Sequence, residues 1–96
     1  MNYAFHPEAE TELAEAIDFY EDREAGLGED FALEVQYTIQ NILSYPRAWP
    51  AVADDVRRCL THRFPYGVLY SIEPDRVYVV AVMHLRRKPR YWKRRR

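Results

Sequence analysis

The hydrophobic pattern of this chain changes its period near the middle, and that change restricts the possible fold more than any other feature. After the proline-bounded segment 46–55, the chain is rich in β-forming residues. Before that segment, apolar residues recur every three or four positions, as they do on one face of a helix. These residues are Ala9, Leu13, Ile17 and Tyr20, followed by Phe31, Val35, Ile39, Ile42 and Leu43. The sequence therefore predicts two amphipathic helices followed by strands.

The bounds of the first elements follow from local signals. Residues 2–6 are predicted to form a short strand, and Pro7 suits the first turn of a helix. Gly26 is expected to end that helix in a left-handed cap. A second helix is predicted over about 29–44, before Pro46. The acids of the first helical turn, which the helix dipole favours, are Glu8, Glu10 and Glu12.

Three strands are predicted in the second half, over residues 56–64, 66–72 and 76–84. The short turn between the last two makes them a hairpin. Residues 76–84 are apolar at nearly every position, which favours a central strand covered by the helices on one face and partly covered on the other. The order β-α-α-β-β-β predicts one α+β domain over residues 1–96, with a helical hairpin packed on a mostly antiparallel, twisted four-stranded sheet. Only the last few residues are expected to be disordered.

Composition excludes several classes of protein. No apolar run approaches the ~20 residues that span a bilayer. The single cysteine, Cys59, has no internal disulfide partner, and no signal peptide is visible, which together favour the cytoplasm. The three histidines lie far apart in the sequence, so we expect neither a metal site nor a cofactor.

The near-neutral total charge hides a strong segregation. Residues 1–48 hold eleven acids and two bases, a net charge of −9, whereas residues 49–96 hold four acids and twelve bases, a net charge of +8. Eight of those bases lie in the tail, residues 85–96. We therefore expect an acidic helical face and a single cationic patch at the far end of the sheet, able to meet an anionic partner.

Five segments, in this order and at these spacings, resemble the ParE/RelE toxin family of bacterial type II toxin–antitoxin modules over about residues 3–94. They are HPEAETELAEAIDFYE, GLGEDFALEV, RAWP, RRCLTHRFPYGVLYSI and AVMHLRRKPRYWKRR. The resemblance implies a compact α+β fold and a cytoplasmic growth inhibitor. It also implies a cognate antitoxin protein, usually encoded beside the toxin, that holds it inactive.

The family divides by target. RelE-like members cleave mRNA in the ribosomal decoding site, whereas ParE-like members poison DNA gyrase without known hydrolytic chemistry. A third alternative is a catalytically inactive chain that still binds its antitoxin. A metal-independent endoribonuclease needs a base near the ribose 2′-OH, cations on the phosphate and an acid for the leaving oxygen. The candidates for these roles are His84, Arg86, Arg63, Arg58 and Tyr91.

Each catalytic candidate also has a plain structural interpretation. His84 ends a buried strand, where a histidine bonded to nearby backbone is common, and His62 is expected to be simply exposed. Tyr91 and Trp92 are expected to fold back and anchor the tail. Cys59 is interpreted as a core residue, because no activating partner is identifiable.

Two departures weaken the nuclease interpretation. Strong mRNA cleavers of the family carry an arginine directly after the aromatic residue that opens the penultimate strand, and Gly67 stands there in this chain. Residues 24–46 contain no Lys or Arg, so the second helix would be repelled by RNA. These departures favour the ParE-like branch.

The tail is predicted to be an interaction surface, because antitoxins of such modules have acidic or amphipathic C-terminal segments that wrap the toxin or extend its sheet. The residues predicted to bind the target or the antitoxin are Arg57, Arg86, Arg87, Arg90, Tyr91, Trp92 and Lys93.

Overall fold

The computed structural model describes residues 1–95 and contains two helices and five strands within them. The predicted tail residue Arg96 lies outside this range. In chain order the elements are β1 (Asn2–Phe5), α1 (Pro7–Arg23), α2 (Leu27–Ser44), β2 (Ala51–Ala53), β3 (Val56–Leu60), β4 (Tyr66–Ile72) and β5 (Arg76–His84).

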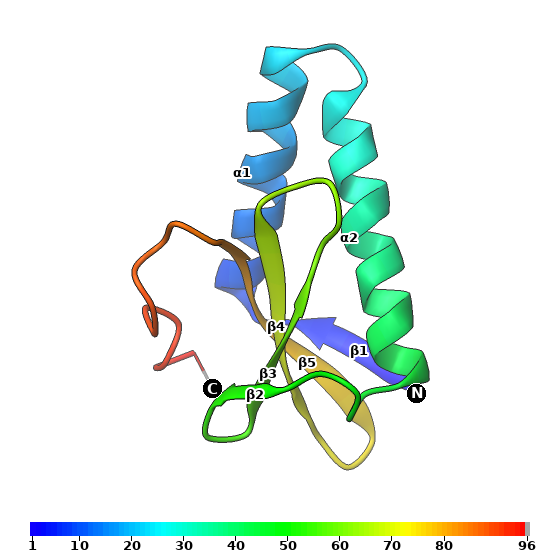
Figure 1. Cartoon of the computed structure of the whole chain (residues 1–96), viewed down its shortest axis with the longest axis vertical. Helices are drawn as coiled ribbons and strands as arrows, with labels where there is room; N and C mark the ends of the chain where they lie inside the picture. The colour runs from blue at the N-terminus through cyan, green and yellow to red at the C-terminus, as the bar shows by residue number, and fades with distance from the viewer. Residues whose placement is uncertain (96) are drawn as a thin grey trace.

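The helices form an antiparallel hairpin behind one twisted sheet (Figure 1). The strand order is β1-β5-β4-β3-β2, with β1 parallel to β5 and every other pair antiparallel. The predicted α+β class, the helical hairpin and the mostly antiparallel sheet are confirmed. The predicted strand count of four was too low by one, because the segment expected to be a loop contains the three-residue edge strand β2.

Several element bounds differ from the prediction. Strand β1 ends at Phe5 rather than at residue 6, and α1 ends at Arg23 with the extended Glu24 as its C-cap, so the prediction that Gly26 caps this helix was wrong. Helix α2 begins at Leu27 rather than near residue 29, because Gly26 adopts the left-handed conformation (φ 91°) and its carbonyl already accepts from the Asp30 amide. Strand β3 ends at Leu60 rather than at residue 64. The Thr61 hydroxyl donates to the Phe64 and Tyr66 carbonyls, at 2.7 and 3.1 Å, and so closes a turn before β4.

A β-bulge in β5 explains why this strand is apolar at almost every position. Leu69 pairs with Ala81 and Tyr70 pairs with Val79, which leaves Val80 as the extra residue. Val79 faces the helices, Val80 and Ala81 both join the cluster on the opposite face, and the residue after them returns to the helical side. After the bulge, the positions that face the helices are therefore shifted by one residue. This shift places His84, at the end of the strand, toward α1.

The two faces of the sheet are covered to different extents, because the tail covers only part of the face opposite the helices. The helices cover one face and enclose the larger core, which includes Phe31, Val35 and Tyr70. The opposite face, called the open face below, has a smaller cluster into which the tail inserts Trp92. No helix within residues 1–95 is long and apolar enough to cross a membrane.

Candidate functional site

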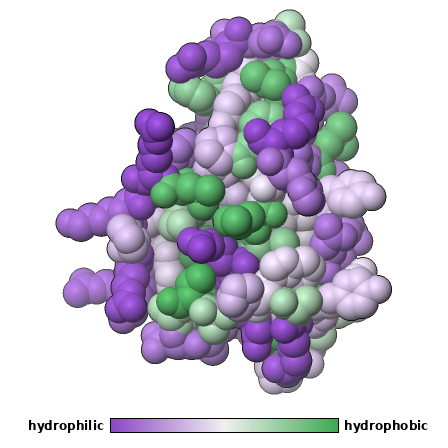
Figure 2. All heavy atoms as spheres, in the orientation of Figure 1, coloured by the Kyte–Doolittle hydropathy of each residue, from purple (hydrophilic) through white to green (hydrophobic). Residues whose placement is uncertain are grey.

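The open face of the sheet carries a groove beside the tail. Arg58 of β3 and Arg90 of the tail line this groove, which has a volume of about 310 Å³, and Leu69, Met83 and Trp92 form its apolar part. On the face drawn in Figure 2, hydrophobic atoms gather in the middle, and hydrophilic atoms line the side where Figure 1 places the tail. The groove therefore combines apolar surface with two cations, a combination that suits an amphipathic, anionic segment of a partner.

Gly67 shapes this groove. It lies opposite Leu60 and Met83 in the neighbouring strands, and a Cβ atom at this position would stand 3.1 Å from the Cγ and Cδ atoms of Arg58. The missing side chain thus gives the stem of Arg58 room to lie across β4.

Arg57, the neighbour of Arg58, points to the other side of the strand because side chains alternate. Its guanidinium Nη1 donates to the carbonyls of Arg47 and Trp49, at 3.2 and 2.6 Å. These bonds hold the loop before β2. The predicted target-binding role of Arg57 is therefore not supported by its contacts, since the guanidinium serves the loop.

His84 lies at the helical side of the sheet, away from the open-face groove. Its Nδ1 accepts from the Arg86 amide at 3.0 Å, which agrees with the structural interpretation of a strand-end histidine. Its ring packs edge-on against Tyr66, with centroids 5.1 Å apart. A small cavity of about 220 Å³ joins His84 to Arg87 and to Glu15 of α1. Arg58 lines none of this cavity.

Arg63 and His62 occupy a third place, the loop between β3 and β4. They line a groove of about 380 Å³ against α2. The Arg63 amide donates to the Glu34 carboxylate at 2.7 Å, and its guanidinium forms an exposed ion pair with Asp30 at 3.6 Å. Both contacts join the loop to α2, so Arg63 has a structural role in positioning this loop.

The tail folds back on the molecule, as the anchor interpretation of Tyr91 and Trp92 predicted. The Trp92 side chain is buried, with 4% of its surface exposed, and lies in the open-face cluster. The Trp92 indole therefore presents only a small part of its surface, at the lining of the open-face groove. The expectation that the last few residues are disordered is wrong as far as Arg95, which is also buried.

Glu12 of α1 holds the folded-back tail. Its carboxylate accepts from the Tyr91 hydroxyl at 2.6 Å and from both terminal nitrogens of Arg95 at 2.8 and 3.0 Å. The Arg87 guanidinium reaches it at 3.4 Å and stacks over the Tyr91 ring. Burial, followed by the hydrogen bond to Glu12, raises the pKa of Tyr91, so the phenol stays a proton donor. Burial lowers the pKa of Arg95, but its contacts with Glu12 outweigh this effect and raise the pKa.

The sequence interpretation missed Glu12 as a functional residue and treated it as an acid of the first helical turn. A signal was present, because Glu12 lies three residues after Ala9 and four before Ala16, and both alanines are buried. This spacing puts the carboxylate on the buried face of α1. An acid on such a face needs a partner.

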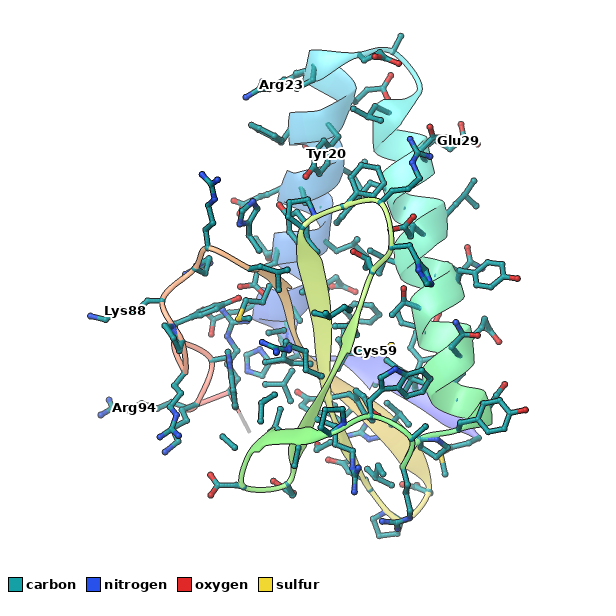
Figure 3. All side chains as sticks on the ribbon, viewed as in Figure 1. Tyr20, Arg23, Glu29, Cys59, Lys88 and Arg94 are labelled. Carbon is teal, nitrogen blue, oxygen red and sulfur yellow. The ribbon has the colours of Figure 1, made fainter. Side chains whose placement is uncertain are left out.

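Most of the exposed cations lie in the tail, and Lys88 and Arg94 point away from the sheet (Figure 3). The single cationic patch expected from the sequence is only partly present, because Arg57, Arg63, Arg87 and Arg95 are used in internal contacts. The exposed cations of the tail are Arg86, Arg87, Lys88, Arg90, Lys93 and Arg94, of which Arg87 also contacts Glu12.

The five catalytic candidates do not form one constellation. Arg58 lies on the open face, and Arg63 lies against α2. His84 lies on the helical side, and Arg86 is beside it, with its amide bonded to His84 Nδ1. Tyr91 is occupied by Glu12. Cys59 is buried in the main core, and burial raises the pKa of its thiol to about 11, which agrees with a core role. Within residues 1–95, no group of three His, Cys, Asp or Glu side chains could hold a metal ion.

Comparison with known proteins identifies the family. The model of the ParE toxin of the type II toxin–antitoxin system, parDE, matches residues 3–89. A solved structure described as the chromosomal ParDE toxin–antitoxin system from P. aeruginosa has the same fold, with a TM-score of 0.64 and 14% sequence identity over 88% of this chain and 96% of that chain. A search of curated proteins finds no match.

Proposed function

Because this chain belongs to the ParE toxin family of type II toxin–antitoxin systems, we propose that it inhibits growth by binding DNA gyrase, without hydrolytic chemistry of its own. A cognate antitoxin, encoded by the adjacent gene, neutralises it in the cytoplasm. In this proposal the toxin acts through a protein-binding surface, made of the tail and the open-face groove.

One observation supports this branch most strongly: the catalytic candidates His84, Arg58 and Arg63 lie on three separate surfaces, and Arg87, the cation that lines the His84 cavity, is paired with Glu12. A general base must reach the 2′-OH while cationic donors hold the same phosphate. His84 and Arg58 line different cavities on different sides of the sheet. The acidic, base-free helix α2 would also repel RNA.

The antitoxin is proposed to bind the open-face groove and the exposed cations of the tail. An acidic amphipathic segment would bury its apolar residues against Leu69 and Met83 and pair its carboxylates with Arg58 and Arg90. If gyrase uses the same surface, antitoxin binding blocks it sterically. Arg58→Glu is expected to weaken antitoxin binding, with an exposed charge reversal elsewhere, Arg23→Glu, as the matched control.

The target is tested by inducing the protein in bacteria and recording which response comes first. The proposal predicts a DNA-damage response and filamentation while mRNA remains intact. Early loss of mRNA and translation would contradict it and indicate the RelE-like nuclease. An absence of both responses, together with tight antitoxin binding, would indicate an inactive partner. Co-expression of the adjacent gene is expected to restore growth.

A further inference from the structure

We propose that Glu12 is a positioning residue for toxin activity. It holds the C-terminal segment 85–95 against α1 and β5, so that the segment meets the target as an ordered surface. This inference rests on the proposed function, since the surface matters for activity only if the target binds it.

The contacts of Glu12 with the tail are too many and too buried for a chance surface pair. The side chains of Glu12 and Arg95 are 11% and 8% exposed, and the two groups meet through two hydrogen bonds. The Tyr91 hydroxyl donates a third bond to the same carboxylate. Removing the Glu12 charge would leave the buried Arg95 guanidinium with a single, longer ion pair within residues 1–95, to the exposed Glu8 at 3.8 Å, so the arrangement depends mainly on Glu12.

The same groups also complete the free edge of β5. Strand β1 ends at Phe5, and its last bond to β5 is the His6 amide donating to the Val79 carbonyl at 2.9 Å. Beyond that point, Arg95 donates to the Val80 carbonyl at 3.2 Å and Glu12 accepts from the Val82 amide at 3.0 Å. Side chains of the tail and of α1 therefore replace a neighbouring strand, which joins the tail to the sheet at a defined position.

Fixing the segment at this position orders the cations that it carries. Trp92 is inserted in the open-face cluster, while Lys88 and Arg94 project outward (Figure 3). A segment that is already ordered loses less conformational entropy on binding than a free tail of the same composition. The contacts of Glu12 with the tail, called the clamp below, therefore favour target binding by preorganising the segment. They also stabilise the fold.

The direct test is Glu12→Gln, which keeps an acceptor for the Val82 amide but removes the charge that pairs with Arg95. In a Trp49→Phe background, Trp92 is the only indole. We expect a red shift of its emission and at least about tenfold faster trypsin cleavage within residues 86–94. We also expect at least about a tenfold rise in the concentration that inhibits supercoiling by purified gyrase.

Glu10→Gln is the matched control, because it makes the same chemical change at an exposed position of α1. Tyr91→Phe is the milder variant if Glu12→Gln fails to fold, since it removes one hydroxyl and keeps the ring under Arg87. It is expected to change emission, cleavage and inhibition in the same direction as Glu12→Gln, by smaller amounts. Far-UV circular dichroism checks that each variant is folded.

Two outcomes would overturn the inference. Unchanged cleavage and emission in Glu12→Gln would show that Glu12 does not hold the segment. A released segment with unchanged gyrase inhibition would show that the clamp has only a structural role. If the unmodified protein does not inhibit gyrase at all, the proposed function fails together with the positioning role. In that case cleavage and emission still decide whether Glu12 holds the segment.

Discussion

At the residue scale, the environment of a side chain decides its chemistry more than its type does. Cys59 is a potential nucleophile by type, yet it is 4% exposed and burial raises its pKa to about 11. The thiolate, which is the reactive form, is therefore scarce at neutral pH.

We predict that Cys59 of the folded protein reacts with a thiol reagent at pH 8 at least about a hundredfold more slowly than in the unfolded chain, because its pKa is about two units above the ordinary value and the sulfur is covered. The reaction with Ellman's reagent, with and without urea, measures this ratio. Equal rates would contradict the buried assignment.

Tyr70 provides a second prediction. Its hydroxyl donates to the Pro46 carbonyl at 2.6 Å, which joins β4 to the loop after α2. Tyr70→Phe leaves that carbonyl without this donor and should lower the free energy of unfolding by about 1–3 kcal/mol in urea titrations. Tyr37→Phe, at an exposed tyrosine, is the control and should change stability little.

The pH dependence of Tyr70 follows from its pKa, which burial raises to about 12 from 10.0. The folded state therefore binds this proton more tightly than the unfolded state does. The resulting stability is present below pH 10 and is lost as the pH rises toward 12. Tyr70→Phe removes this contribution, so its stability should decrease less than that of the unmodified protein over that range.

Individual residues were predicted where the pattern determined their environment. The burial of Cys59 and the fold-back of Tyr91 and Trp92 followed from their apolar character and are confirmed. Glu12 was missed because its partners lie about 70–80 residues away in the sequence. A local pattern contains no information about which distant arginine will pair with a given acid.

At the element scale, the hairpin of β4 and β5 was predicted to the residue, because runs of β-forming residues flank a short turn. Strand β2 was missed because a three-residue edge strand has no period of its own. Strand β3 was predicted too long, since the turn at Thr61 depends on its side-chain hydrogen bonds. The β5 bulge could not be read from a run that is apolar throughout.

The close contact between α1 and α2 provides a prediction for Gly28. A Cβ atom there would stand 2.6 Å from the Ile17 carbonyl oxygen and 2.9 Å from the Glu21 Cβ. Gly28→Ala should therefore destabilise the protein by about 2 kcal/mol, although alanine favours a helix by about 1 kcal/mol over glycine. Urea titration measures the change.

Glu29→Ala, at the exposed neighbouring position, is the control for this substitution and should change stability much less. A Gly28→Ala protein as stable as the original would show that the two helices can separate without cost.

At the scale of the whole molecule, the segregation of charge in the sequence becomes two differently charged regions. The helical hairpin holds most of the acids, and the tail holds six exposed cations. The prediction of a single cationic patch from all the arginines was too simple, because several of them pair inside the molecule.

We predict that Lys88→Glu/Arg94→Glu abolishes most of the growth inhibition without changing the thermal midpoint, since both side chains are exposed and point into solvent. The association rate with gyrase should fall by about tenfold or more and should depend less on salt concentration. Arg23→Glu/Arg47→Glu makes the same charge change away from the tail and should remain toxic. Equal loss in both double variants would indicate an effect of net charge alone.

The central claim is that the chain acts on gyrase by binding and does not cut RNA. The most direct measurement adds the purified protein in parallel to a gyrase supercoiling reaction and to a translating extract whose mRNA is mapped by primer extension. The account predicts loss of supercoiling and no new mRNA ends. Ribosome-dependent mRNA ends, with supercoiling unaffected, would contradict it.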